Sequence, residues 1–515
     1  MHRGADLVFV GGRVFTAAPG RSWATAFAIR DGRIVAAGTD TQVERWSDKG
    51  TRRTDLRGRV VLPGFIDAHA HLADSAGELG WTRLNGTRSL ENALSRLRKA
   101  AARTPPGDWV VGVDWDEAKW IERRFPTRED LDRVSKDHPV VARRIDCHIG
   151  SVNSRALELA RDLVNLRGFE VDGSGRPTGV LKEEAFEELH ERFESPEEVL
   201  GRNLPRVARM VHRLGITSVH DVLNPMEWRA YQRLRRAGRL RLRVYAMLRD
   251  RVAPALAGAG MSTGMGDEWL RLGAVKVFAD GSLGAYTAAL DAPYADRTEE
   301  RGMFVHPPLE LKSILESVHR AGLQTATHAI GDAAVRLVTQ TLTEVQDEVH
   351  GQRMRHRIEH FELPDEEVLR QSRSAGLIAS CQPNFIGQWS GPGDVYESRL
   401  GVDRARGNNP YRRILRHRIP LCFGSDGMPY GPLFGIHWAV NGYHDDQRVS
   451  PEDAVRAYTS GGAYAAFEET FKGTLEPGKV ADFVVLEGDP FQEPTAIDRC
   501  RVLETWIGGS RVFAR

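Results

Sequence analysis

The chain has 515 residues, of which 41% are hydrophobic and 27% are charged, and its formal net charge is +1. These values are ordinary for a globular protein, and the length suits one long barrel as well as several smaller domains. Balanced charge argues against a nucleic-acid-binding surface, which needs clustered basic residues. No apolar run is long enough to cross a membrane, and the first residues lack a signal-peptide pattern, so we expect a cytoplasmic protein.

The four cysteines stand far apart in the sequence and form no closely spaced pair; they are Cys147, Cys381, Cys422 and Cys500. This spacing does not predict a disulfide framework, and reduced thiols agree with a cytoplasmic location.

Both ends of the chain contain short apolar runs separated by Gly-Gly and Asp-Gly turns, a pattern that is typical of β-hairpins. We therefore expect residues 1–60 and 472–515 to form one small β-sandwich domain. Two unrelated hairpins that cap the core are the alternative interpretation.

Between the two ends, over residues 61–471, short apolar runs alternate with longer helical patterns. The runs are Val60–Asp67, Ile216–His220, Leu242–Leu248, Ala274–Ala279, Gln324–His328, Arg357–His360, Leu377–Cys381 and Leu421–Ser425. This alternation predicts an α/β fold, a (β/α)₈ TIM barrel, although a doubly wound open sheet would alternate in the same way. Residues 75–214 contain strand-like pieces and acidic helices of their own, so we expect them to be a large insertion after the first barrel strand.

The sharpest motif is the pair His69 and His71 at the end of the first predicted barrel strand. Alternate side chains of a strand point the same way, so the two imidazoles can bind one metal ion. One such pair is weak evidence, but other histidines and one aspartate also close predicted strands, and the strand ends of a barrel meet at one mouth. We therefore predict a metal site composed of His69, His71, Lys276, His328, His360 and Asp426.

Lys276 lies inside an apolar predicted strand, where an ammonium group beside a cation would be repelled. Three interpretations remain open. Lys276 reacts with carbon dioxide to form a carbamate that bridges two metal ions, it binds the substrate, or it forms a salt bridge with an acid such as Asp280.

Several motifs, from Leu62–His71 through 328–332 and 423–426 to 473–482, resemble those of the amidohydrolase superfamily. Within it, the sequence is similar to the amidohydrolase 3 branch, which includes N-substituted formamide deformylase-like enzymes. The resemblance implies that the predicted residues form the metal constellation and that Lys276 is the position carbamylated in binuclear members. It also implies that the segment around His148 reaches over the active site, so His148 is a candidate substrate contact.

The residues and the resemblance imply the same reaction, hydrolysis of a carbon–nitrogen bond other than a peptide bond in a small-molecule substrate. A zinc-like cation lowers the pKa of bound water to about 7 and so supplies hydroxide. Asp426 then moves the proton to the leaving group, and Asp426 and Lys276 are the predicted catalytic residues. We expect one or two zinc ions, with Mn²⁺, Fe²⁺ and Ni²⁺ as alternatives, and with two ions about 3.5–4 Å apart where Lys276 is carbamylated.

His220 and Gln382 close two further predicted strands and are candidate substrate contacts, like His148. A mononuclear deaminase is the alternative enzyme. It needs an acid beside a strand-end histidine, and Glu359, which precedes His360, is expected to face away from the mouth. A non-catalytic scaffold is a third interpretation, but such relatives lose metal ligands and none is missing here. A homodimer is the default expectation for the assembly.

Overall fold

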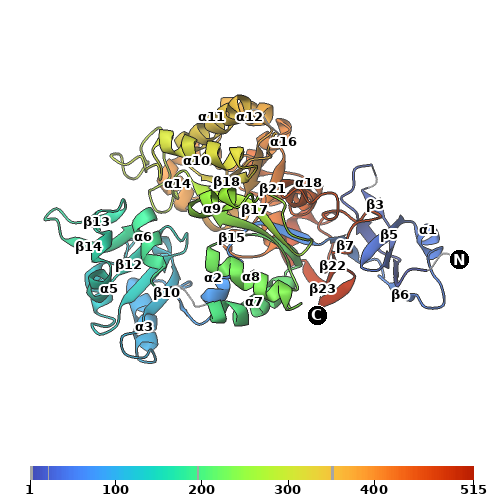
Figure 1. The fold of residues 1–515 in the computed structure, drawn as a ribbon, viewed down its shortest axis with the longest axis horizontal. Coiled ribbons are helices and arrows are strands. Elements are labelled where there is room, and N and C mark those ends of the chain that lie inside the picture. The colour runs from blue at the N-terminus through green and yellow to red at the C-terminus, as the bar shows by residue number, and fades with distance from the viewer. Residues whose placement is uncertain (1–3, 21, 194–196, 350–352) are drawn as a thin grey trace.

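The computed structural model describes residues 4–20, 22–193, 197–349 and 353–515. Residues 1–3 and 21 of the expected β-sandwich domain, 194–196 of the expected insertion and 350–352 of the expected barrel lie outside the described residues. In Figure 1 the barrel occupies the middle of the molecule, with a β-sandwich at one end and the insertion at the other. No helix among the described residues combines the length and the hydrophobicity that crossing a lipid bilayer requires.

An eight-stranded parallel sheet forms the barrel, and its strands are hydrogen-bonded in chain order. They are β8 (Phe65–Ala70), β15 (Ile216–Leu223), β16 (Arg243–Arg249), β17 (Leu270–Phe278), β18 (Gln324–Ala329), β19 (Arg357–His360), β20 (Ile378–Cys381) and β21 (Leu421–Phe423). The first and last strands meet where the backbone N–H of Asp426 donates to the carbonyl of His69 over 2.8 Å. The predicted α/β barrel is confirmed.

Helices surround this sheet and bury their apolar faces against it. They include α2 (Leu72–Gly77), α7 (Glu197–His212), α8 (Pro225–Arg236), α10 (Pro308–Arg320), α11 (Asp332–Glu348), α12 (Glu366–Ala375), α16 (Tyr411–Arg416), α17 (Pro432–Asn441), α18 (Pro451–Ala457) and α19 (Ser460–Ala465). Local sequence sets their ends. Asn224 and Glu227 form a capping box at the start of α8, and α12 ends at Gly376, whose φ of 67° suits glycine.

The first predicted strand, Val60–Asp67, is two strands. β7 (Val60–Pro63) belongs to the sandwich, whereas β8 begins the barrel. The chain crosses from one to the other at Gly64, whose N–H donates to the carbonyl of Asp482. A Cβ atom on Gly64 would lie 2.4 Å from Oγ1 of Thr217, so this crossing needs a residue without a side chain.

Two sheets, built from both ends of the chain, form the sandwich. One contains β5 (Arg33–Gly38), β4 (Ala26–Arg30), β1 (Leu7–Val10) and β6 (Arg52–Asp55); the other contains β24 (Ser510–Ala514), β23 (Arg501–Ile507), β22 (Phe483–Glu487), β7, β2 (Arg13–Phe15) and β3 (Trp23–Ala24). Phe9 stacks on Phe27 with ring centroids 4.8 Å apart, and both meet Phe483 edge-on. Aromatic side chains from distant parts of the sequence therefore share one core.

The expected insertion, 75–214, contains a six-stranded sheet of its own. Its strands are β13 (Phe169–Val171), β14 (Pro177–Lys182), β12 (Ile149–Val152), β11 (Val140–Arg144), β10 (Val110–Trp115) and β9 (Thr82–Arg83), with helices α3 (Leu90–Ala101), α4 (Arg128–Asp132), α5 (Ser154–Leu159) and α6 (Glu183–His190). Helix α7 lies within the same range, but its apolar residues Leu200, Leu204 and Val207 join the core of the barrel.

Candidate metal centre

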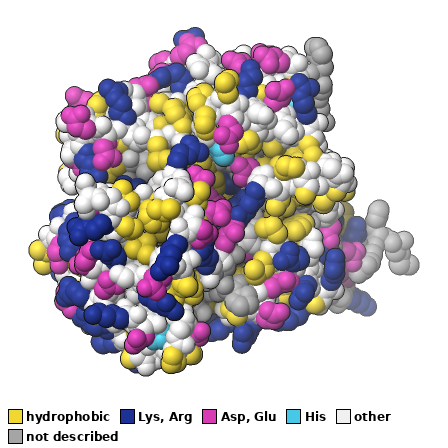
Figure 2. Space-filling model, turned by 60° about the vertical axis from the view of Figure 1, so that its left-hand side comes forward, with side chains coloured by type: hydrophobic (Ala, Val, Ile, Leu, Met, Phe, Trp, Pro, Cys, Tyr) yellow, Lys and Arg dark blue, Asp and Glu magenta, His cyan; other side chains and the backbone are white. Residues whose placement is uncertain are grey.

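A cavity of about 900 Å³ opens at the carboxyl ends of the barrel strands. All six predicted metal-site residues line it, and the insertion supplies the facing wall, including His148. Seen from the side of the insertion, acidic, basic and histidine side chains surround a hollow near the middle of this face (Figure 2). The structure thus brings the predicted residues into one polar cavity of ligand-binding size.

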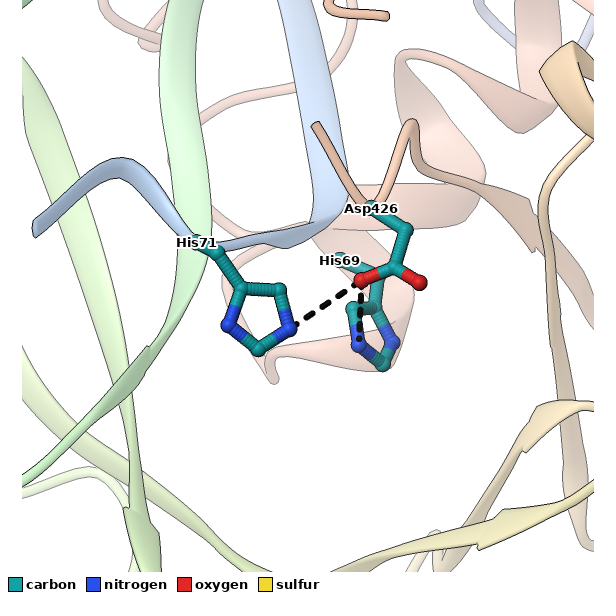
Figure 3. Close-up of side chains that lie close together, drawn as sticks. All are labelled: His69, His71 and Asp426. Carbon is teal, nitrogen blue, oxygen red and sulfur yellow. Dashed lines mark ion pairs between the residues drawn. The ribbon is translucent and has the colours of Figure 1, made fainter. Parts of the chain in front are cut away.

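His69, His71 and Asp426 form the tightest group, because one ligand atom of each lies within 4.8 Å of the others. Oδ1 of Asp426 is 3.1 Å from Nε2 of His71 and 3.4 Å from Nε2 of His69 (Figure 3). Two imidazoles and a carboxylate that meet at one point are a donor set suited to a divalent transition metal.

Three histidines keep one ring nitrogen for a protein oxygen and direct the other toward the cavity. The Nδ1 contacts are His69 to Oε2 of Glu359 (2.6 Å), His71 to Oδ2 of Asp74 (3.0 Å) and His360 to Oε1 of Gln382 (2.8 Å). Metal-binding histidines are held in this way, because the second hydrogen bond fixes the ring and leaves the other nitrogen basic. The residues present therefore fit a metal ion.

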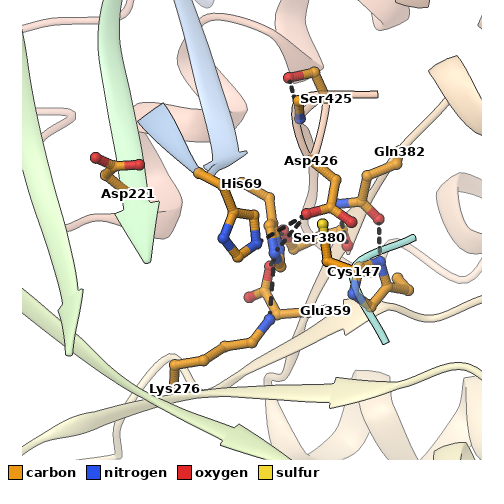
Figure 4. A network of polar contacts seen from close by, with 12 residues as sticks. His69, Cys147, Asp221, Lys276, Glu359, Ser380, Gln382, Ser425 and Asp426 are labelled. Atoms are coloured by element: carbon orange, nitrogen blue, oxygen red, sulfur yellow. Dashed lines mark hydrogen bonds and ion pairs between the residues drawn. The ribbon is translucent and has the colours of Figure 1, made fainter. Parts of the chain in front are cut away.

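Backbone geometry places these side chains. Asp426 has a φ of 55°, and the preceding Ser425 donates from its N–H and its hydroxyl to the two carboxylate oxygens of Asp67. Asp221, on β15, accepts the N–H groups of Leu72 and Ala73 and so anchors the start of α2, which follows His71 directly. In Figure 4, Asp221 lies apart from the polar network around His69.

Lys276 is buried on β17, and its Nζ lies 3.2 Å from Nε2 of His69 (Figure 4). Burial lowers the pKa of Lys276 to about 8, although Glu359 and Asp426 oppose the shift. A salt bridge with Asp280, one of the three interpretations of this lysine, is not found among the described residues. The Asp280 carboxylate instead accepts the backbone N–H groups of Ala289, Ile330 and Gly331.

His328 and His360 complete the histidine side of the cavity, with ring centroids 4.4 Å apart. Nε2 of His328 lies 3.1 Å from the carbonyl oxygen of Gly281, so its Nδ1 is the nitrogen left for the site. Burial lowers the pKa of His360 to about 4 and that of His328 below its ordinary value. Both rings are therefore neutral near pH 7, the form that binds metals.

Glu359 was expected to face away from the mouth; it does not line the cavity, but it points into the barrel and contacts the metal centre through His69. It is buried, contacts His69 and accepts hydrogen bonds from Arg357 and Ser380. Glu359 lies on the same inner face of β19 as Arg357 two residues earlier, and the backbone of His360, whose φ is 72°, turns the next side chain to that side as well. Because the strand becomes left-handed there, the alternation of faces breaks and both neighbouring side chains point inward.

The three predicted substrate contacts have different positions. His148 lines the cavity, with Nδ1 2.8 Å from Oε2 of Glu183. Gln382 instead contacts His360, and His220 lies inside the barrel beside Arg357, so the structure places neither on the cavity wall. For His220 the reason is strand length, since β15 continues to Leu223 and leaves the histidine below the mouth.

Comparisons with known proteins find relatives that match almost the whole chain. A relative described as protein LONG AFTER FAR-RED 3 from Arabidopsis thaliana is 28% identical over 547 residues, covering 99% of this chain and 92% of the relative. An N-substituted formamide deformylase from Arthrobacter pascens is 26% identical over 548 residues, covering 99% and 98%.

A solved structure of an uncharacterized metal-dependent hydrolase from Pyrococcus furiosus superimposes with a TM-score of 0.75 at 29% identity, covering 94% of this chain and 99% of that one. The model of the amidohydrolase family matches residues 53–513, which include the barrel and every residue of the candidate metal centre. The chain belongs to the amidohydrolase family.

Proposed function

We propose that this protein is a metal-dependent hydrolase that cleaves an amide-like, non-peptide carbon–nitrogen bond in a small molecule. The observation that carries the proposal is the set of three histidines whose Nδ1 atoms are fixed by protein oxygens while their Nε2 atoms face the cavity beside Asp426. The name of the Arthrobacter pascens relative, a formamide deformylase, supports the same bond type.

His69, His71, His328, His360 and Asp426 would hold the metal, and this mixture of imidazoles and carboxylate suits zinc. A bound divalent cation supplies two things here, a lower pKa for water and polarisation of the substrate carbonyl.

Asp426 is the proposed proton shuttle. Burial alone would raise its pKa, but the neighbouring His69 and His71 hold it below the ordinary value, so the group is a carboxylate at neutral pH. Its oxygen lies between the two imidazoles at the edge of the cavity. From there it can accept a proton from water and return it to the departing nitrogen.

We propose that Lys276 carries a carbamate, because a neutral amine reacts with carbon dioxide and a carbamate does not repel a cation as an ammonium does. The protein then binds two metal ions per chain. Lys276→Ala should lower this stoichiometry to one, and short carboxylic acids added to the variant should restore the second ion. A variant that still binds two ions unaided would exclude the carbamate.

Glu359 bears on the deaminase alternative. Its carboxylate is engaged by His69, Arg357 and Ser380, and it does not line the cavity. It therefore has no access to a substrate, which argues for the hydrolase.

The test is metal analysis combined with a substrate screen. Purified protein should contain transition metal, and N-formyl, N-acyl, carbamate and cyclic-imide compounds should be screened with metal-loaded enzyme. Removal of the metal by a chelator should abolish hydrolysis and its return should restore it. Full activity in metal-free protein would reject the proposal, and release of ammonia from ring amidines alone would favour the deaminase.

A further inference from the structure

A small pocket of about 40 Å³ opens beside the metal centre, and we call it the side pocket. It shares six lining residues with the main cavity, which are Asp146, His148, His328, His360, Asp426 and Met428. Most of its remaining wall is apolar, composed of Leu283, Ile330, Phe385, Trp389, Val395 and Tyr396.

This apolar wall is built by segments that follow the barrel strands, including α13 (Asn384–Trp389) and α14 (Val395–Leu400). Its residues form a hydrophobic cluster separate from the barrel core. The ring of Phe385 stacks on the ring of His360, with centroids 5.9 Å apart. On Phe385 also packs the ring of Trp389, whose centroid lies 4.9 Å from that of Phe385. An aromatic surface therefore runs directly from a predicted metal ligand into the side pocket.

The polar groups of the side pocket already have protein partners. Glu362 accepts hydrogen bonds from Asn408 and from the hydroxyl of Tyr396. Asp146 is paired with Arg144 and accepts the hydroxyl of Ser282. A charged ligand group would have to displace one of these contacts, whereas an apolar group would displace none.

The main cavity differs in size and chemistry. It has more than twenty times the volume, about 900 Å³ against about 40 Å³, and acidic and basic side chains line it. We propose that the side pocket binds one compact apolar substituent of the substrate, while the polar remainder occupies the main cavity. This inference rests on the proposed hydrolase function and adds the class of substrate, an amide-like compound with a short branched hydrocarbon group next to the scissile bond.

The first test uses two matched series of amides with metal-loaded enzyme, in which hydrogen, methyl, isopropyl or naphthyl is placed on the acyl carbon or on the nitrogen. In one series kcat/KM should rise from hydrogen to isopropyl, by roughly 10- to 200-fold for each well-placed methylene, and fall at naphthyl because the side pocket is small. Flat profiles in both series, or a preference for an aminoalkyl group, would overturn the proposal.

The second test changes the pocket. Val395→Phe fills it and should abolish the advantage of isopropyl, while Leu283→Ala enlarges it and should move the optimum toward naphthyl. Val402→Phe is the matched control, because Val402 begins α15 (Val402–Arg406) and is 50% exposed. If Val395→Phe does not fold, Leu283→Ala decides alone, and an unchanged optimum in that variant contradicts the proposal.

The third test separates the side pocket from catalysis. Ligand-observed NMR should detect isobutanol binding to metal-free protein, and Val395→Phe, unlike Val402→Phe, should abolish the signal. If no amide is hydrolysed but isobutanol binds in this way, the proposed function fails and the pocket assignment stands. If amides are hydrolysed without side-chain preference and isobutanol does not bind, the pocket assignment alone fails.

Discussion

Each imidazole of the candidate metal centre has one ring nitrogen held by a protein oxygen. For His71 the partner is Asp74, on the first turn of α2, whose carboxylate lies 3.0 Å from Nδ1. Burial alone would lower the pKa of His71, but Asp426 and Asp74 raise it to about 9. Metal binding at His71 would therefore release a proton, and the Asp74 carboxylate fixes the ring in the orientation that the metal needs.

Asp74→Asn should weaken metal affinity by roughly 10- to 100-fold, because the amide fixes the ring less well and lowers its basicity. Competition with a chromophoric chelator measures the change. Asp394→Asn is the control, since Asp394 also lines the cavity but pairs with Lys119 and not with a histidine. Equal affinities in the two variants would show that Asp74 does not position His71.

Asp426→Asn removes the proposed proton shuttle while keeping the size of the side chain. We expect kcat to fall by roughly 10²- to 10⁴-fold, the usual contribution of a positioned general acid–base. Metal content and circular dichroism should be recorded on the same sample, so that lost metal is not mistaken for lost chemistry. Turnover at the wild-type rate in the metal-loaded variant would mean that another group carries the proton.

At the scale of elements, the barrel strands could be located from the sequence because each is a short apolar run followed by a helix. Residues at strand ends, such as His328 and Asp426, could likewise be assigned to one mouth. Three features could not be predicted, because each depends on backbone angles or contacts with no local signal. They are the crossing at Gly64, the left-handed backbone at His360 that turns its side chain to the same side as Glu359, and the extra residues of β15 that bury His220.

Gly64→Ala tests the crossing between β7 and β8. The new Cβ would overlap the side chain of Thr217, so we expect a loss of about 1–3 kcal/mol in the free energy of unfolding. Urea denaturation measures it. Gly173→Ala is the control, because a Cβ there meets nothing within 4 Å, and its effect should stay within about 0.5 kcal/mol. Equal stabilities of Gly64→Ala and Gly173→Ala would show that the junction between β7 and β8 tolerates a side chain.

At the scale of the whole molecule, a buried ion pair joins the barrel to the sandwich. Arg243 at the start of β16 donates through Nε to Oδ2 of Asp482 over 2.6 Å, and through a second nitrogen to Oδ1 over 3.0 Å. Asp482 also accepts the N–H of Gly508, between β23 and β24. One carboxylate therefore contacts the barrel and the last hairpin of the sandwich.

Asp482→Ala should destabilise the protein by about 3–5 kcal/mol, because it leaves the buried Arg243 without its counter-charge. Thermal and denaturant unfolding of the variant measure this loss in the free energy of unfolding. Arg243→Met combined with Asp482→Leu should recover much of the loss, since neither charge then remains buried. If Asp482→Ala is as stable as the wild type, solvent reaches the guanidinium group of Arg243.

The position of β7 between β2 and β22 constrains how the protein is made. On the ribosome, the edge of β7 that later pairs with β22 has no partner until Phe483–Glu487 has been synthesised, after the whole barrel. Unpaired strand edges promote aggregation, and pairings between distant segments form slowly. The unpaired edge of β7 therefore stays exposed on the nascent chain during nearly all of translation. We expect chaperones that cover exposed strand edges to bind the chain before it leaves the ribosome.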